Sequence, residues 1–180
     1  ISVESGRNVY EKLSSTEQYE PVPYFLAGNE QAYSLYRIPI NLMLKDNADD
    51  IKEKILNYNQ HPVIKKIIDQ CGNVTQTFAN TFNLNPPEKT LFEELAQQVK
   101  IVFIALHGRP GEDGELQLQL NKVGLPFNGS RAESSKITID KFQTNELLAQ
   151  NGFKVAQHYK LTEEEWRNNP SATEEKMLKE

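Results

Sequence analysis

Cysteine is nearly absent from this sequence of 180 residues, in which Cys71 is the only one. A single cysteine cannot form a disulfide within the chain, and it leaves no C-x-x-C pair to bind zinc or carry out redox chemistry. A domain of this size buries roughly 70% of the surface that its unfolded chain exposes, so apolar packing is enough to stabilise it. We therefore predict about one domain, in which Cys71 is a packed small residue rather than a nucleophile.

An excess of positive charge is also missing. Lys and Arg number 20 and Asp and Glu number 25, which gives a net charge of -5 and a pI near 5.4. The sequence has no basic stripe and no cluster of aromatic residues among lysines. Nucleic-acid binding is therefore disfavoured.

Long hydrophobic runs are the third absence. No segment approaches the roughly 18 apolar residues of a membrane span, and the N-terminus has neither the basic start nor the apolar stretch of a signal peptide. These absences predict a cytoplasmic protein without a membrane partner. The chain starts at Ile1 without a methionine and ends at Glu180 in a charged, helix-prone stretch. We expect both ends to be cut from a longer protein.

The first half of the chain combines helical and extended patterns. Val9 and Leu13 have the spacing of a short amphipathic helix, which Ser2 or Ser5 could cap. The extended segment 19–26 contains two prolines, which predicts a position near a sheet edge. A second extended segment over 33–44 could pair with it as a hairpin. Helices are predicted from 47, over 62–72 and over 91–99, with an irregular Asn- and Thr-rich stretch over 73–87.

The segment Val99–Leu106 is the most informative part of the sequence, because it is nearly unbroken in apolar, β-branched and aromatic residues. Such a run is typical of a parallel strand covered on both faces. It leads directly into the Gly-rich loop 107–114. The spacing of Leu116 and Leu120 then predicts a helix ended by Gly124. The alternation from Leu116 to Leu120 also suits a strand, but length and the closing glycine favour a helix.

Beyond Gly124 the pattern predicts shorter elements. An extended piece over 125–128 and a small-residue loop precede a long helical stretch over 134–150, and residues 153–156 suit one more strand. Two capping-box patterns, Thr162-x-x-Glu165 and Ser171-x-x-Glu174, each predict the start of a short helix.

The loop 107–114 is the candidate site. A strand, a Gly-rich turn and a helix in succession place loop residues at the carboxyl edge of a parallel sheet, where open α/β folds bind ligands. The glycines let the backbone approach a ligand, and the helix start favours an anion. His107 could donate a hydrogen bond to a carboxylate or carbonyl, and Glu112 or Asp113 could receive an ammonium group or orient a neighbouring loop. The alternative is a tight turn whose charges point to water.

Short motifs around this loop add to the pattern. They are the run 103–114 with the following Leu116-Gln117, then Gly124-Leu125-Pro126-Phe127, Gly129-Ser130, Asp140-Lys141 and Ser2-Val3-Glu4-Ser5-Gly6. Together they resemble the N-terminal domain of D-alanine-D-alanine ligases, in which the Asp-Lys pair belongs to an "MDK" signature and the serine segment to a "VSLxSG" helix start. The resemblance covers about 1–26 and 99–166.

The resemblance implies an α/β, Rossmann-like fold with an open parallel sheet flanked by helices, and the chemistry of an ATP-grasp ligase. ATP would phosphorylate the carboxylate of one D-alanine, and the amine of a second would attack the acylphosphate, giving the dipeptide of cell-wall precursors. His107 would be the counterpart of a histidine beside the first D-alanine, Glu112 would organise the substrate loops, and Lys141 would contact the ATP phosphates. A developing oxyanion and a polyphosphate both need preorganised donors and cations.

Each of these residues also has a structural interpretation. His107 could cap backbone carbonyls, Lys141 could be an exposed helix lysine, and Glu112 could favour a helix N-terminus. His61 and His158 have no ligand-like company in the sequence and are predicted to be surface residues.

The sequence also departs from the family. The family's first strand, its Gly-rich turn and a substrate-contacting glutamate would precede Ile1, and the domains with most ATP and Mg²⁺ contacts would follow Glu180. We therefore expect this chain alone to be inactive, with no catalytic residue and no metal ligand of its own. We predict a substrate-binding domain over 1–160 with a mainly helical insertion at about 47–98, and the start of a linker over 161–180. Arg131 stands where a second glycine is common.

Two other functions stay open at this point. The chain could belong to a non-catalytic relative that acts as a binding or regulatory module, or to an ATP-grasp ligase for another amino or hydroxy acid. The residues downstream of Glu180 would separate these alternatives. The resemblance further implies a homodimer.

Overall fold

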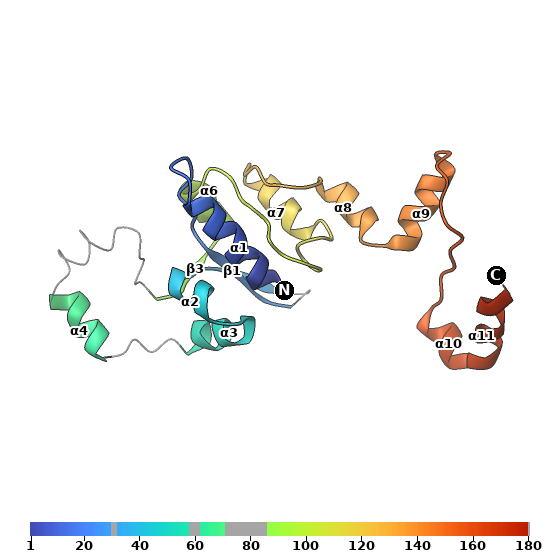
Figure 1. Ribbon diagram of the computed structural model, residues 1–180, viewed down its shortest axis with the longest axis horizontal. Coiled ribbons are helices and arrows are strands. Elements are labelled where there is room, and N and C mark those ends of the chain that lie inside the picture. Colours follow the sequence, from blue (N-terminus) through green and yellow to red (C-terminus); the bar gives the residue numbers. More distant parts are fainter. Residues whose placement is uncertain (30–31, 58–61, 71–85, 180) are drawn as a thin grey trace.

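The computed structural model describes residues 1–29, 32–57, 62–70 and 86–179, which form a mixed α/β arrangement (Figure 1). A small sheet lies at the centre with α1 (Ser2–Ser14) and several shorter helices around it. Among the described residues, no helix is long and apolar enough to cross a membrane. The predictions that concern His61, Cys71 and the stretch 73–85 lie outside the described residues.

The sheet is three-stranded and antiparallel, in the order β1-β2-β3. β1 (Tyr24–Gly28) and β2 (Tyr33–Arg37) form the hairpin that the two extended segments predicted. β3 (Glu88–Thr90) pairs with the other side of β2. β1 is therefore an edge strand, as the two prolines before it indicated.

The remaining helices follow the predicted order with shifts at their ends. α7 and the two helices of the tail begin close to their sequence signals, and α10 has the predicted capping box between Thr162 and Glu165. α11 starts instead after Asn169, whose side-chain oxygen accepts from the Ala172 amide at 3.1 Å. The helices are α2 (Ile40–Lys45), α3 (Ala48–Leu56), α4 (Pro62–Gln70), α6 (Phe92–Gln98), α7 (Glu115–Lys122), α8 (Ala132–Thr138), α9 (Lys141–Gln150), α10 (Glu163–Asn168) and α11 (Pro170–Lys179).

Two apolar clusters hold these elements together. The first cluster joins β2, α6, α7 and the segment that follows α7. Its buried residues are Leu35, Leu95, Leu116, Leu120 and Leu125. Burial of each leucine side chain contributes roughly 1.5–3 kcal/mol, so this cluster fixes α7, and with it the end of the loop 107–114, against the sheet. Because Leu95 is 3% exposed and β3 pairs with β2, the last part of the stretch predicted as an insertion is integrated into the central fold.

The second cluster lies under α1. It consists of Ile38, Ile40, Leu42, Met43 and Ile51, with Val3 and Tyr10 of α1 packed against it. Residues 40–45 were predicted to be extended, but they form α2. The helix turns Ile40 and Met43 toward the same apolar cluster, which an extended chain with its alternating side chains would not do.

The predicted open parallel sheet is not formed among the described residues. The segment 101–106 makes one isolated parallel bridge, between Val102 and Phe127. Beyond this bridge, the Ile104 amide donates to the side-chain oxygen of Asn128 at 2.6 Å, where a paired strand would offer a main-chain carbonyl. Ile101 and Phe103 are 59% and 53% exposed, so this segment lacks the covering that the apolar run predicted.

The predictions for the second half also needed correction. The helical stretch predicted over 134–150 is divided into α8 and α9 at Asp140, whose side chain accepts from the Gln143 amide at 3.0 Å and so caps α9. An N-cap residue is not helical, and a single helix cannot continue through it. Residues 153–156 form no strand.

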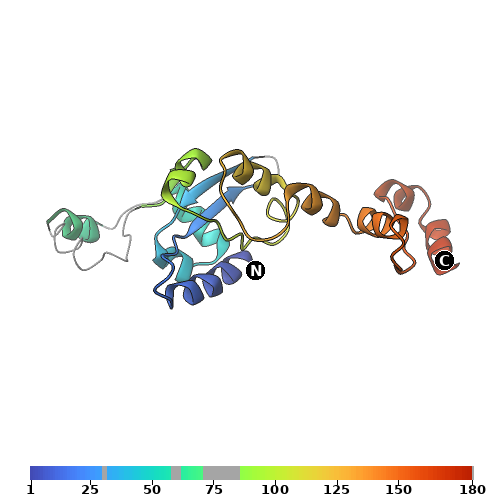
Figure 2. The same ribbon diagram turned by 90° about the horizontal axis from the view of Figure 1, so that it is seen from above.

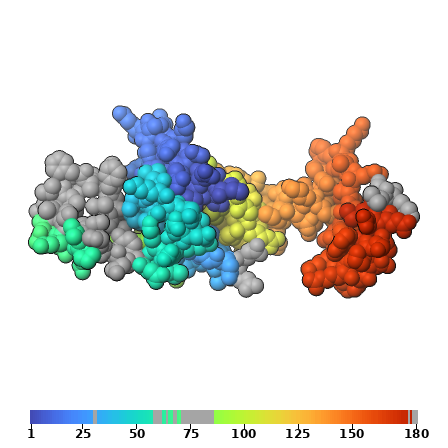
Figure 3. Space-filling view, turned by 60° about the horizontal axis from the view of Figure 1, so that its bottom comes forward, coloured from blue at the N-terminus to red at the C-terminus, as the bar shows by residue number. Residues whose placement is uncertain are grey.

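The C-terminal helices lie away from the sheet. Figure 2 shows α8 and α9 leading outward from the central elements, and in Figure 3 α10 and α11, coloured red, form the end of the molecule. Thr173 ties this pair together, since its hydroxyl donates to the carbonyl oxygen of Asn169 at 2.8 Å and lies 3.3 Å from that of Glu165.

Candidate functional site

His107 follows the segment 101–106 and is held by the first turn of α1. Its main-chain amide donates to Ser2 Oγ at 3.1 Å. Its ring Nε2 lies 2.8 Å from Ser5 Oγ. The side chain nevertheless remains 51% exposed, so one face of the ring is available to a ligand.

Glu112 closes the loop onto the same histidine. Its Oε2 accepts from the Gly108 amide at 2.8 Å, and its Oε1 lies 4.0 Å from His107 Nδ1. Gly108 has a φ of +72°, a conformation that glycine adopts without strain. Glu112 therefore shapes the turn that carries His107, whereas Asp113, which precedes the N-cap residue Gly114, accepts from the Glu115 amide at 3.1 Å.

The middle of the loop is fixed from α7. The buried Gln117 donates from Nε2 to the Gly111 carbonyl at 2.7 Å. A Cβ at Gly111 would lie 2.4 Å from Leu106 Cβ, so the loop and the end of the preceding segment are in close contact. The Arg109-Pro110 peptide bond is cis.

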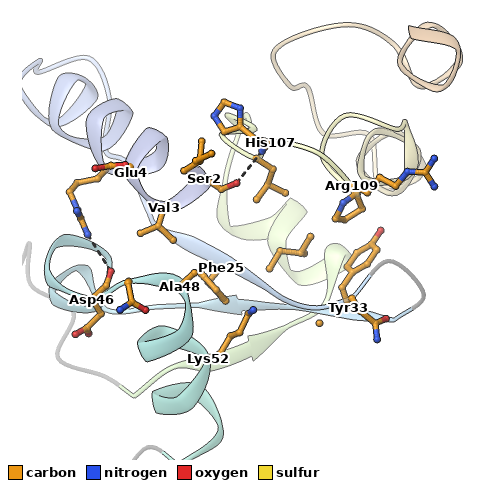
Figure 4. A pocket seen from close by; sticks show the side chains of 18 of the residues that line it. Ser2, Val3, Glu4, Phe25, Tyr33, Asp46, Ala48, Lys52, His107 and Arg109 are labelled. Atoms are coloured by element: carbon orange, nitrogen blue, oxygen red, sulfur yellow. Dashed lines mark hydrogen bonds between the residues drawn. The ribbon is translucent and has the colours of Figure 1, made fainter. Parts of the chain in front are cut away.

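A cavity of about 780 Å³ opens beside His107 (Figure 4). The start of α1, the β1–β2 hairpin, residues 45–48 and residues 106–110 contribute to its wall. Figure 4 shows the Ser2–His107 hydrogen bond on one side of the cavity, with Tyr33 and Arg109 lying near each other on another. Basic side chains in the lining are Arg7, Lys45, Lys52 and Arg109, and acidic ones are Glu4 and Asp46.

Two of the lining residues are constrained by their surroundings. Arg7 donates to the Met43 carbonyl from Nε at 3.0 Å and from Nη2 at 2.9 Å, which ties α1 to the end of α2. Burial, followed by the negative charges of Glu115 and Asp113, raises the pKa of the Tyr33 hydroxyl. Tyr33 therefore stays neutral at physiological pH and can serve as a hydrogen-bond donor in the cavity.

Lys141, in contrast, lies outside this cavity. It is the first residue of α9, it is exposed, and Asp140 before it is the N-cap. The structure thus brings His107 and Glu112 together and leaves Lys141 apart from them. No group of three or more His, Cys, Asp or Glu side chains that could hold a metal ion occurs within the described ranges.

His158 lies at the surface, as the sequence predicted, but its neighbours partly cover it. Its side chain is 19% exposed, and Nε2 lies 2.9 Å from Glu146 Oε1. Nδ1 lies 2.9 Å from the Ala156 carbonyl oxygen. The hydrogen bond to Ala156, followed by that to Glu146, raises the pKa of the imidazole.

Sequence reasoning missed several residues of the site. Ser2 and Ser5 were interpreted as helix caps, but the N-cap of α1 is Ile1 and both hydroxyls contact His107. Their spacing of three on a helix, which places both on one side, was the available signal. Arg7 and Tyr33 had no comparable signal, because only folding brings them to the cavity.

Comparison with known proteins indicates the same family as the sequence motifs of the loop 107–114 and of the segment 2–6. A family model described as "D-ala D-ala ligase N-terminus" matches residues 1–130. This chain belongs to the D-alanine-D-alanine ligase family. The match includes His107, Glu112, Ser2 and Ser5, whereas Lys141 lies beyond it.

Two curated relatives agree with this assignment, and one solved structure is similar over part of the chain. A D-alanine-D-alanine ligase of Chlorobium limicola is 28% identical over 176 residues, which cover 97% of this chain and 44% of the relative. The ligase of Moorella thermoacetica is 41% identical over 80 residues, 44% of this chain and 26% of the relative. A crystal structure of the ligase from Aeromonas hydrophila is 39% identical, covers 43% of this chain and 27% of that chain, and has a TM-score of 0.36. The chain thus spans less than half the length of these relatives.

Proposed function

We propose that residues 1–160 are the N-terminal, substrate-binding domain of an ATP-dependent D-alanine-D-alanine ligase, and that 161–180 begin the linker to an ATP-grasp domain. The observation that carries this proposal is the family match over 1–130, which contains a loop whose histidine lies in the wall of a large cavity. The chain covers less than half of its relatives, so the activity is proposed for the longer protein. This chain alone is expected to be inactive.

The proposed reaction joins two D-alanine molecules. The γ-phosphoryl group of ATP passes to the carboxylate of the first D-alanine, giving an acylphosphate and ADP. The amine of the second D-alanine then attacks the acyl carbon, loses a proton, and displaces inorganic phosphate. The product dipeptide would serve as a precursor of peptidoglycan.

His107 is the residue of this chain that we assign to the first D-alanine. Its ring borders the cavity and is half exposed, and an imidazole N–H is a suitable donor to a carboxylate or to the oxyanion that develops from it. Glu112 shapes the turn through Gly108 and so keeps the ring at the wall of the cavity. Tyr33 and the basic side chains of the lining favour an anionic substrate.

Lys141 is proposed to contact the ATP phosphates. Its position at the exposed start of α9 is compatible with a partner outside the described residues, because an ammonium group there can reach phosphate oxygens as a point charge. The donor sets within the described ranges do not fit a Mg²⁺ site, so no step through the metal is assigned to this chain. The Mg²⁺ that accompanies ATP would be held mainly by the ATP-grasp domain.

The finer fold prediction also belongs to this proposal. Two observations support a Rossmann-like parallel sheet around 101–106 in the longer protein. They are the parallel bridge between Val102 and Phe127 and the exposed apolar side chains of Ile101 and Phe103.

A homodimer is proposed on the resemblance to the family. A cytoplasmic location follows from the proposed use of ATP.

The test is to incubate the full-length protein with ATP, Mg²⁺ and D-alanine and to measure D-alanyl-D-alanine and phosphate release. We expect ATP-dependent dipeptide formation. His107→Ala should raise the D-alanine KM about tenfold or more, because a hydrogen bond to a charged group is lost, while the ATP KM stays unchanged. His158→Ala, which removes a histidine far from the cavity, is the matched control.

Two outcomes would overturn the proposal. A folded full-length protein that binds D-alanine without turnover would be a binding module. A protein that turns over another amino or hydroxy acid in preference to D-alanine would be a different ATP-grasp ligase. Unchanged D-alanine kinetics in His107→Ala would contradict the role of that residue alone.

A further inference from the structure

Ser5 contacts His107 across 102 positions of the sequence, with its Oγ 2.8 Å from the ring Nε2. A serine in the first turn of a helix ordinarily bonds to nearby backbone of its own helix or faces water. Ser2, three residues earlier in the same turn, accepts from the His107 amide at 3.1 Å. The first turn of α1 therefore holds both the backbone and the ring of one residue.

The backbone of α1 packs close to the segment that carries His107. A Cβ built at Gly6 would lie 3.8 Å from the Cβ of Ala105, an ordinary van der Waals distance, so this part of the helix lies beside the end of that segment. The close approach places Ser5 beside the imidazole. The contact is thus part of how α1 packs, and it does not depend on a long mobile side chain.

The other ring nitrogen faces a carboxylate. Nδ1 lies 4.0 Å from Glu112 Oε1, and the second oxygen of Glu112 is committed to the Gly108 amide. The Ser5 hydroxyl can donate to an unprotonated Nε2 or accept from a protonated one. Because a hydroxyl both donates and accepts, Ser5 restrains the ring in either state.

We propose that Ser5 is a positioning residue for His107, which fixes the orientation of the ring at the cavity wall and thereby the affinity for the first substrate. This inference rests on the proposed function, since His107 is the assigned substrate contact. Ser2 has a different part, because its hydroxyl accepts from the main-chain amide of His107.

The experiment compares Ser5→Ala with Ser15→Ala in the full-length protein. Alanine has a higher helix propensity than serine, so the substitution does not weaken α1 by itself. Ser15 is the C-cap residue at the other end of α1, and its hydroxyl donates to the Lys12 carbonyl at 2.8 Å. We expect Ser5→Ala to raise the D-alanine KM roughly three- to tenfold, the value of one net hydrogen bond, with an unchanged ATP KM. Ser15→Ala should have no effect, and Ser5→Thr, which keeps the hydroxyl, should restore most of the affinity.

A double-mutant cycle separates positioning from a general structural effect. If Ser5 acts through the ring, Ser5→Ala should have no further effect in a His107→Ala background. Equal effects of Ser5→Ala in both backgrounds would overturn the proposal, as would an unchanged D-alanine KM in the folded variant.

A spectroscopic measurement tests the contact independently of activity. The ring ¹⁵N chemical shifts of His107, assigned by their loss in His107→Ala, should change in Ser5→Ala and remain unchanged in Ser15→Ala. Unchanged ring shifts in Ser5→Ala would overturn the proposal even in an active enzyme. If the shifts change in a protein that does not ligate D-alanine, the contact between Ser5 and His107 is supported and the proposed function is contradicted.

Discussion

Gly114 and Gly124 flank α7 and share a left-handed backbone, with φ of +93° and +71°. They differ in their surroundings. A Cβ at Gly114 would lie 2.4 Å from the backbone oxygen of Ala132, whereas a Cβ at Gly124 would meet nothing within 4 Å. The first glycine is therefore required by both conformation and space, and the second by conformation alone.

We expect Gly124→Ala to destabilise the fold by about 1 kcal/mol, the cost of a left-handed alanine. Gly114→Ala should cost about 1–3 kcal/mol more, because α8 must move away from the start of α7. The measurement is the thermal unfolding midpoint of the full-length protein carrying each substitution. Equal shifts in the two variants would show that the contact with Ala132 adds nothing.

At the level of single residues, local sequence patterns indicated some residues of the site and missed others. His107 and Glu112 were predicted from the loop itself, because the glycines and charged residues are adjacent in the chain. Ser5 was interpreted as a cap, since its local context is a helix start and its partner lies 102 positions away. A pairwise contact over that distance is set by the packing of α1 on 101–106 and leaves no local pattern.

Among the elements, the segment after α9 is held to that helix by His158. Both ring nitrogens face oxygen acceptors, the Ala156 carbonyl and Glu146 Oε1. A neutral imidazole has one N–H and can donate to only one of them, so the protonated ring satisfies both. Phe142 of α9 contacts the same ring with centroids 5.3 Å apart, and Lys160 Nζ lies 5.6 Å from the Phe142 centroid.

This arrangement predicts a pH-dependent attachment. The pKa of His158 is raised in the folded state, so its stabilising contribution is complete below the unfolded pKa of about 6.5 and is lost as the pH rises through the higher folded pKa. We expect amide-exchange protection factors over 156–160 to fall across that range. The matched variants are Glu146→Gln, which should lower the NMR titration midpoint of His158, and Glu133→Gln in α8, which should not. An unaltered midpoint in Glu146→Gln would contradict the role of this carboxylate.

Regular periodicity predicted most helices and the β1–β2 hairpin, because local apolar spacing determines which face of a segment can be buried. The errors have local or tertiary causes. Asp140 ends one helix and caps the next, although both halves have helical spacing. The apolar run 101–106 has a strand pattern, but a strand also needs main-chain hydrogen-bond partners on a neighbouring segment. The amide of Ile104 bonds instead to the side chain of Asn128.

In the molecule as a whole, α9 lies away from α1 and the sheet (Figures 1 and 2), and Lys141 at its start is not among the residues that line the cavity beside His107. The two proposed ligand contacts should therefore be separable by mutation. Lys141→Ala in the full-length protein is expected to raise the ATP KM about tenfold through loss of a charge-assisted phosphate contact, with the D-alanine KM unchanged. Lys136→Ala, in the last turn of α8, is the control. Steady-state kinetics with each substrate varied in turn would measure both constants, and an ATP KM insensitive to Lys141→Ala would identify an exposed helix lysine.

The local features of this protein follow from its amino-acid order: most helical and extended segments, the Gly-rich loop with His107 and Glu112, and the motifs typical of the family. These depend on residues that are neighbours in the chain. Three other features became known from the folded chain, namely that the sheet of the described residues is antiparallel, that β3 and α6 join the central fold, and that Ser5 contacts His107. Those features depend on which distant segments bury their apolar faces together, and that choice is made by the energy of the assembled fold rather than by any one segment.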